Sequence, residues 1–129
     1  MKLIIGGAFQ GKRRYAAECF GISEEDILSG ENAAPDDLYG CKAVSEFHLL
    51  IKSAGTAPEA ASSFIDGIYE RNPDIIIICD EVGAGITPVE RIERDWRETV
   101  GRTCCRAAEL SDTVVRIHCG LPQTIKEMS

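Results

Sequence analysis

A glycine-rich run near the start of the chain has the spacing of a phosphate-binding loop. Residues 6–13 read GGAFQGKR, so a glycine is followed after four residues by Gly-Lys. Glycines let backbone amides turn inward around a phosphate, the next helix adds its N-terminal dipole, and the lysine brings a point charge to the outer phosphates. The predicted phosphate ligands are Gly6, Gly7, Ala8, Gly11, Lys12 and Arg13.

The residue that follows Gly-Lys departs from the usual loop. A serine or threonine there supplies the hydroxyl that holds Mg²⁺, whereas this chain has Arg13. Arginine has no acceptor atom and is always charged, so it cannot ligate a cation. Two interpretations follow: the metal is held by other residues, or phosphate binds without metal-assisted transfer. A glycine-rich turn with a surface lysine is the structural alternative to both.

Two carboxylates, Asp80 and Glu81, follow the most apolar segment of the chain, Ile75–Cys79. Ligands of open α/β sheets gather at the carboxyl ends of strands, and an acid after a buried strand next to a phosphate loop is a second metal-site ligand. We therefore predict Lys12, Asp80 and Glu81 as catalytic residues. An ordinary turn aspartate is the alternative, and no separate metal site is predicted.

The order of the expected elements indicates an α/β fold, with a small parallel sheet of about four strands flanked by helices. We expect the strands of residues 2–5 and 75–79 to lie side by side, so that both loops open at one edge. The expected strands are residues 2–5, 26–29, 74–79 and 113–119, and the expected helices are residues 11–20, 38–54, 58–71 and 88–110. The last helix has an apolar stripe at Val89, Ile92, Trp96, Val100, Thr103 and Ala107.

Composition and charge exclude several classes of partner. The 129 residues are 44% hydrophobic and 27% charged, which suits one globular domain over 1–129. The net charge of −7 argues against nucleic acid, and no apolar run approaches the ~20 residues of a membrane span. The N-terminal apolar patch is too short for a secretory signal. We expect a cytoplasmic protein with six reduced cysteines and no Cys-x-x-Cys pair.

The residues after the isoleucine strand carry a resemblance to a known family. Residues 80–88, DEVGAGITP, resemble the Asn-Glu-Val-Gly-x-Gly-Ile-x-Pro motif of the bifunctional adenosylcobinamide kinase / adenosylcobinamide-phosphate guanylyltransferase family. The resemblance covers residues 74–126 and 2–18 and is absent between them. It implies a three-layer P-loop NTPase-like architecture, a place in cobalamin biosynthesis, GTP or ATP as the nucleotide, a corrinoid acceptor and a homo-oligomer. Further nucleotide-binding candidates are Gly83, Gly85, Arg91 and Arg94.

The departures from the family bear on activity. The family transfers GMP through a guanylylated histidine, whereas His48 and His118 stand in no family motif. We expect His48 to be a partly buried helix residue, and we do not expect guanylyl transfer. Three functions compete: a nucleotide-dependent kinase with weak turnover, a non-catalytic relative that binds nucleotide or phosphate, and a small interaction module. The module would use the exposed face of the last helix, opposite its apolar stripe, which carries Arg91, Arg94, Arg102 and Arg106.

Overall fold

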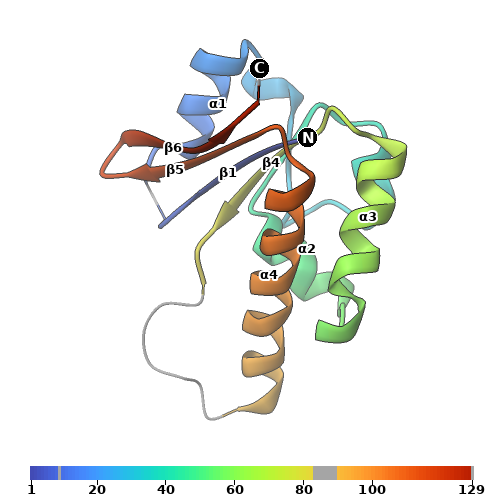
Figure 1. Cartoon of the computed structure of the whole chain (residues 1–129). Coiled ribbons are helices and arrows are strands. Elements are labelled where there is room, and N and C mark those ends of the chain that lie inside the picture. Colours follow the sequence, from blue (N-terminus) through green and yellow to red (C-terminus); the bar gives the residue numbers. More distant parts are fainter. Residues whose placement is uncertain (9, 83–89, 129) are drawn as a thin grey trace.

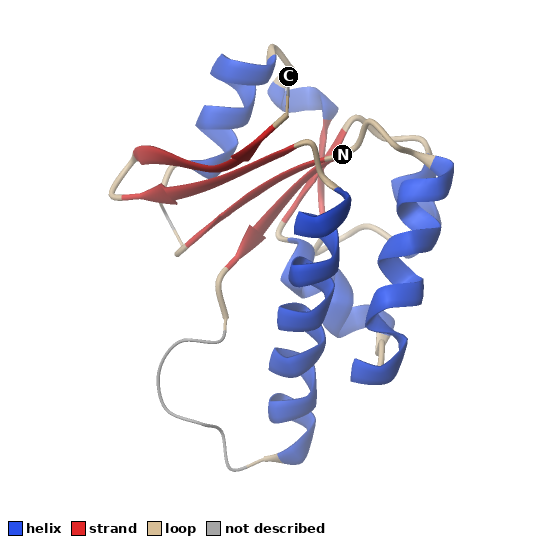
Figure 2. Cartoon of the chain, in the orientation of Figure 1, coloured by secondary structure: helices blue, strands red, loops and turns tan. Residues whose placement is uncertain are grey.

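A six-stranded sheet forms the centre of the molecule, and helices cover both of its faces (Figures 1 and 2). The structure is a computed structural model that describes residues 1–8, 10–82 and 90–128. The strands are β1 (Lys2–Gly6), β2 (Ile27–Ser29), β3 (Ala43–Ser45), β4 (Ile76–Asp80), β5 (Thr113–His118) and β6 (Leu121–Glu127). The helices are α1 (Lys12–Phe20), α2 (Phe47–Ala54), α3 (Ala61–Arg71) and α4 (Arg91–Leu110), with 3-10 turns η1 (Glu24–Asp26), η2 (Pro35–Tyr39) and η3 (Pro58–Ala60).

The strand order is β2-β3-β4-β1-β5-β6, and every neighbouring pair is parallel except β5 with β6. The predicted α/β class and the predicted adjacency of β1 and β4 are both confirmed, with Gly6 in register with Asp80. Because both strands are apolar on both faces, they can lie only where helices cover the sheet on each side. The loops after β1 and β4 therefore leave the same edge of the sheet.

Alternate side chains of the central strands β1 and β4 pack into two separate hydrophobic cores, one on each face of the sheet. Leu3 and Ile77 pack on the face covered by α2, α3 and α4, while Ile4 and Ile78 pack on the face covered by α1. All four side chains are at most 1% exposed. This division follows from the two-residue repeat of a strand, and it places the end of β4 between the two helical layers.

The predicted helix over residues 38–54 is wrong in its first half. Residues 43–45 form β3, and α2 begins only at Phe47. The spacing of three between Val44 and Phe47 imitates a helical stripe, yet it arises where a strand ends and a helix begins. Both side chains are fully buried, so hydrophobicity alone does not separate the two structures.

The predicted number of about four strands is also too small, because β3 and β6 were not expected. The strand β6 follows a tight turn in which Cys119 and Gly120 both have positive φ, 53° and 76°. Such a turn is typical of a two-residue hairpin. Nearly all of β6 is exposed, and Pro122 lies within it, as is usual only for an edge strand. Because neither face of β6 is buried, its sequence lacks the alternation of apolar and polar residues that marks a strand.

The apolar stripe predicted on α4 is confirmed from Trp96, which is partly buried and packs against the core, to Ala107. Val100, Thr103 and Ala107 are buried, whereas Ile92 is 81% exposed and does not belong to the core. The predicted start at residue 88 and the stripe residue Val89 lie outside the described residues. Among the helices that the structure describes, none is both long enough and apolar enough to cross a membrane.

The connection that leads into β3 is fixed by the partly buried side-chain amide of Asn72. Asn72, just after α3, donates from Nδ2 to the carbonyl oxygens of Leu38 at 2.8 Å and Cys41 at 2.7 Å. These two bonds satisfy main-chain acceptors in a segment with little regular structure. They tie η2 and the residues that lead into β3 to the end of α3.

Candidate functional site

The glycines at the two ends of the loop after β1 each meet a steric or conformational requirement. A Cβ atom on Gly6 would lie 2.5 Å from the carbonyl oxygen of Ile117, so only glycine fits beside β5 at this point. Gly11 has φ 87° and caps the N-terminus of α1, a conformation that glycine adopts without strain. The two glycines thus allow the chain to turn sharply from strand to helix and to bring Lys12 into the first turn of α1. The predicted ligand Ala8 is exposed on this loop.

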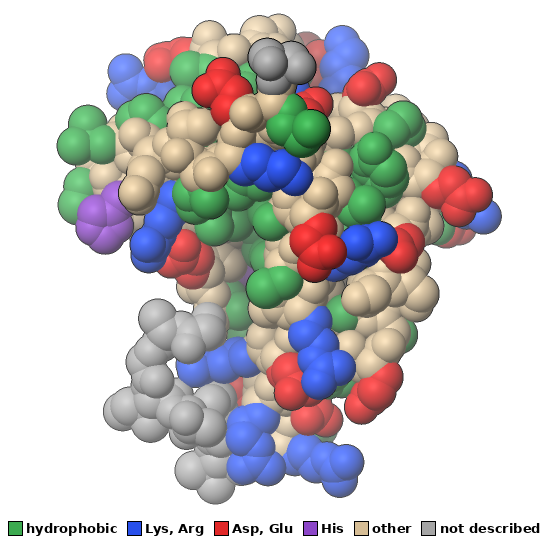
Figure 3. All heavy atoms as spheres, in the orientation of Figure 1, with side chains coloured by type: hydrophobic (Ala, Val, Ile, Leu, Met, Phe, Trp, Pro, Cys, Tyr) green, Lys and Arg blue, Asp and Glu red, His purple; other side chains and the backbone are tan. Residues whose placement is uncertain are grey.

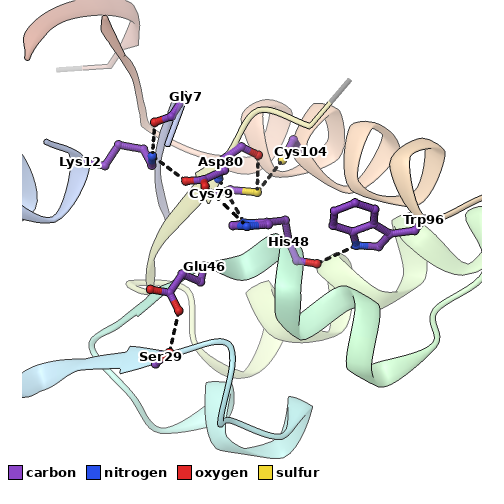
Figure 4. A network of polar contacts seen from close by, with 9 residues as sticks. All are labelled: Gly7, Lys12, Ser29, Glu46, His48, Cys79, Asp80, Trp96 and Cys104. Atoms are coloured by element: carbon purple, nitrogen blue, oxygen red, sulfur yellow. Dashed lines mark hydrogen bonds and ion pairs between the residues drawn. The ribbon is translucent and has the colours of Figure 1, made fainter. Parts of the chain in front are cut away.

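Lys12 points back toward the loop and the end of β4 (Figure 4). Its ammonium donates to the carbonyl oxygen of Gly7 at 2.7 Å and lies 2.6 Å from Asp80 Oδ1. The lysine is only 7% exposed, although lysine side chains are seldom buried unless they are paired. The prediction that Lys12 and Asp80 meet at one edge of the sheet is therefore confirmed.

His48 is the third member of this cluster, and the sequence did not predict its contact with Asp80. The main-chain N–H of Asp80 donates to His48 Nδ1 at 3.4 Å, so we assign the proton to Nε2, which lies 3.6 Å from Asp80 Oδ2. Burial lowers the pKa of His48, which keeps the ring neutral. The indole N–H of Trp96 donates to the main-chain oxygen of His48 at 2.8 Å and fixes α2 against α4.

Arg13, which stands where a metal-binding hydroxyl is usual, reaches across to the end of β3. Its Nη1 donates to Ser45 Oγ at 2.8 Å, and Ser45 in turn donates to the carbonyl oxygen of Leu28 at 3.3 Å. The next residue, Glu46, has a left-handed backbone with φ 51° and accepts a bond from Ser29 Oγ at 2.8 Å. The strained turn at Glu46 aims the start of α2, and with it His48, toward β4.

These side chains surround a cavity of about 540 Å³ between the glycine loop and the start of α2. Its lining combines three cations with three carboxylates and one imidazole. The cations are Lys12, Arg13 and Arg14, the carboxylates are Glu24, Glu46 and Asp80, and the imidazole is His48. The predicted loop residues Ala8 and Gly11 also line it. The three cations all lie on α1, whereas the carboxylates come from η1, the junction between β3 and α2, and the end of β4.

Glu81 does not line the cavity beside Lys12, because its carboxylate pairs with Arg116 of β5. Its carboxylate accepts from Arg116 Nη2 at 3.0 Å, and Arg116 Nε lies 2.9 Å from its other oxygen. Its main-chain N–H donates to Gly6 O, which ties the residue to β1. Consecutive side chains after a strand diverge, so Asp80 and Glu81 do not form a carboxylate pair in the cavity. Glu81 and Asp80 both line a second cavity of about 390 Å³, against α4.

The arginines predicted as nucleotide ligands lie away from the cavity beside Lys12. Arg91 and Arg94 are exposed on α4, and neither belongs to the residues that line that cavity. The side chain of Arg91 is 86% exposed and lies 3.8 Å from Asp95. Figure 3 shows basic and acidic side chains mixed along this helix, as expected of a solvated face with ion pairs four residues apart. The predicted ligands Gly83 and Gly85 lie outside the described residues.

The donor set of the cavity does not match the needs of a divalent metal. Asp80, Glu46 and Glu81 are each engaged by a different partner: Lys12, Ser29 and Arg116. Within the described residues, no group of three or more histidine, cysteine, aspartate or glutamate side chains is arranged to hold a metal ion. Mg²⁺ prefers oxygen ligands in near-octahedral geometry, and these three carboxylates already face an ammonium group, a hydroxyl donor and a guanidinium group.

Comparison with known proteins assigns the chain to a family. The model of the family described as cobinamide kinase / cobinamide phosphate guanyltransferase matches residues 38–125. The chain belongs to this family. The match includes residues 38–73, where the resemblance read from the sequence was absent, so family character extends over β3, α2 and α3. The glycine loop at residues 6–13 precedes the matched segment, while His48 and Asp80 lie inside it. A search of the curated proteins finds no match.

Membership in the cobinamide kinase family supports the relation to cobalamin biosynthesis and to nucleotide substrates. The architecture agrees with it, since a mostly parallel sheet carries a glycine loop after its first strand. The sequence gives no signal for the role of His48, because the junction at Glu46 that positions it is seen only in the structure. No motif marks that position.

Proposed function

We propose that the cavity beside Lys12 binds the phosphates of GTP or ATP, and that this family member is a kinase-like protein with weak phosphoryl transfer. The observation that carries the proposal is the position of Lys12. Its ammonium group is buried at the first turn of α1 and lies between a loop carbonyl and a strand-end carboxylate. A buried lysine at the mouth of a glycine loop supplies the charge that an outer phosphate needs.

Binding would exchange the partners of Lys12. In the free protein its three protons are satisfied in part by Gly7 O and Asp80. A phosphate oxygen can take the place of either partner, because Lys12 faces the cavity and the N-terminus of α1 favours an anion. Arg13 offers a second cation, and it can turn from Ser45 to a phosphate oxygen. Two side-chain cations together replace part of the charge that Mg²⁺ contributes elsewhere.

Weak transfer follows from the chemistry of the cavity. Phosphoryl transfer relies on a metal that bridges the outer phosphates and neutralises the developing charge. The hydroxyl that would hold the metal is replaced by Arg13, and Glu81 is engaged by Arg116. Cobinamide, a corrinoid alcohol, is the acceptor that the family name suggests. The second cavity shares Asp80 with the first, which makes it the proposed place for the acceptor hydroxyl.

A non-catalytic role is the second candidate, and the position of Arg13 favours it. A protein that binds a nucleotide through Lys12 and Arg13 without metal could act as a binding or interaction module. The two candidates share the phosphate site and differ only in turnover. They are separated by incubating the protein with cobinamide and labelled ATP or GTP, since the kinase transfers label to the corrinoid and the binding module does not.

Isothermal titration with ATP, GTP and inorganic phosphate, with and without Mg²⁺, tests the binding site itself. Lys12→Ala is expected to weaken nucleotide binding by about 2–3 kcal/mol, the value of a hydrogen bond to a charged group. Lys42→Ala is the matched control, because Lys42 is exposed and pairs with Asp26 outside the cavity. Equal affinity of the Lys12→Ala variant and the parent for every nucleotide would show that the loop is only a structural turn.

A further inference from the structure

Two cysteine side chains are in contact next to Asp80, between β4 and α4. Cys79 is the residue before Asp80 in β4, and Cys104 lies on α4, with the two Sγ atoms 3.7 Å apart (Figure 4). We propose that this pair is a redox modification site, at which a small aliphatic disulfide oxidises the two thiols to an internal disulfide. All six cysteines are free thiols in the structure, so the pair is present in its reduced form. The proposal goes beyond nucleotide binding and does not depend on it.

The two thiols differ in the way that such a reaction requires. Cys79 is completely buried, whereas Cys104 is partly exposed and lines the second cavity of about 390 Å³. The contact with Cys79 lowers the pKa of Cys104, and the same contact together with burial raises the pKa of Cys79. A thiolate is the attacking species in disulfide exchange, so Cys104 is the entry point and Cys79 the resolving thiol.

The reaction balances in two exchange steps. The Cys104 thiolate attacks one sulfur of the small disulfide, whose S–S bond breaks and releases one small thiolate. Cys79 then gives up its proton as its sulfur attacks Cys104 Sγ, and the second small thiolate leaves. The small disulfide is reduced by two electrons to two thiols, and the protein is oxidised by two electrons. For the new bond, the Sγ–Sγ separation shortens from 3.7 Å to about 2.05 Å.

Formation of this disulfide would change the position of Asp80 in the cavity beside Lys12. Cys79 Sγ lies 3.4 Å from the carbonyl oxygen of Asp80, and the Asp80 carboxylate is 2.6 Å from Lys12. A movement of β4 toward α4 therefore displaces the group that holds the lysine. Trp96, the one tryptophan of the chain, lies on α4 two turns before Cys104 and bonds to His48. Its fluorescence reports the same movement without any nucleotide.

The test starts from a parent protein in which the three exposed cysteines, Cys19, Cys105 and Cys119, are serine. The reduced protein is incubated with oxidised glutathione and mapped by peptide mass spectrometry without reductant. We expect one peptide pair linked through residues 79 and 104, lighter than the two free peptides by two hydrogens. The Cys79→Ser variant should stop at glutathione bound to Cys104, and the Cys104→Ser variant should form neither product.

A matched variant retains Cys105 and lacks Cys104. Cys105 is the next residue of the same helix and is exposed, so it should bind glutathione without forming a link to Cys79. Trp96 emission should shift on oxidation of the parent and return on addition of dithiothreitol. The proposal is overturned if Cys104 keeps its glutathione while Cys79 stays free, if Cys105 links to Cys79 as readily, or if the disulfide forms with no change in emission.

Discussion

Replacing Asp80 by asparagine distinguishes two roles of the carboxylate at the end of β4. In a metal-dependent loop this acid helps to hold Mg²⁺, and its loss weakens nucleotide binding when the metal is present. In the structure the same acid instead neutralises Lys12 across 2.6 Å. Asparagine keeps the size and one acceptor oxygen but removes the charge. The variant should therefore release Lys12 to a phosphate rather than impair the site.

The size of the effect follows from the contact that changes. A charge-assisted hydrogen bond contributes about 1.5–3 kcal/mol, and a bond to a neutral acceptor about 1 kcal/mol. Asp80 is 24% exposed, so solvent screens only part of this difference. We expect Asp80→Asn to bind nucleotide in the absence of metal more tightly by about 1 kcal/mol, or about fivefold. The free energy of unfolding should fall by a similar amount, because Lys12 loses its counter-charge.

The assay is titration calorimetry with GTP in EDTA and in Mg²⁺, beside thermal melts that confirm folding. Asp112→Asn is the matched control, because Asp112 also pairs with a lysine, Lys2 at 2.8 Å, but at the opposite end of β1. It should leave the affinity unchanged. A loss of about tenfold or more in Asp80→Asn that occurs only with Mg²⁺ would refute the reasoning, since it would show that Asp80 holds the metal.

Three further variants test the cavity and its supports. Arg13→Ser restores the metal-binding hydroxyl and should raise Mg²⁺-dependent phosphorylation of cobinamide about tenfold or more; robust turnover by the parent that this change does not improve would contradict the role given to Arg13. Burial lowers the pKa of His48 below its usual 6.5, so the contribution of His48 to the free energy of unfolding should be constant above pH 6.5 and fall as the pH drops below it. Urea melts of His48→Gln should lack that slope, and an identical slope would assign it to another group. Asn72→Ala leaves two main-chain carbonyls without their donor and should cost about 1–3 kcal/mol in urea melts, against no measurable cost for exposed Asn32→Ala.

The parts of the fold that the sequence predicted are those with a strong local signal. Four consecutive isoleucines before Asp80 indicate a strand buried on both faces, and the glycines on each side of α1 mark where that helix begins and ends. From these, the rule that parallel strands end at one edge brings Lys12 to Asp80. The strands β3 and β6 escaped prediction because one is only three residues long and the other is almost wholly exposed.

The parts of the site that the sequence did not predict depend on tertiary contacts. His48 reaches Asp80 because Glu46 takes a left-handed conformation and turns α2 toward β4, and glutamate has no preference for that conformation that could be read in advance. Glu81 was expected to work with Asp80, but the contact with Arg116 of β5 draws it away. Arg91 was chosen for its nearness in sequence to the loop after β4, yet it lies on the exposed side of α4.

The central position of β1 has a consequence for synthesis on the ribosome. This strand emerges first, but its two neighbours in the sheet come much later, since Lys2 pairs with Ile76 and with Thr113. Until α4 and β5 have been translated, the apolar side chains of β1 are not fully buried. Lys12 likewise lacks its ion-pair partner until Asp80 has been translated. Non-local pairing of this kind slows folding and leaves nascent strands open to wrong partners. Ribosome-stalled chains that stop before β5 should therefore depend on chaperones, and they should gain a native Trp96 signal only when residues 113–118 have left the exit tunnel.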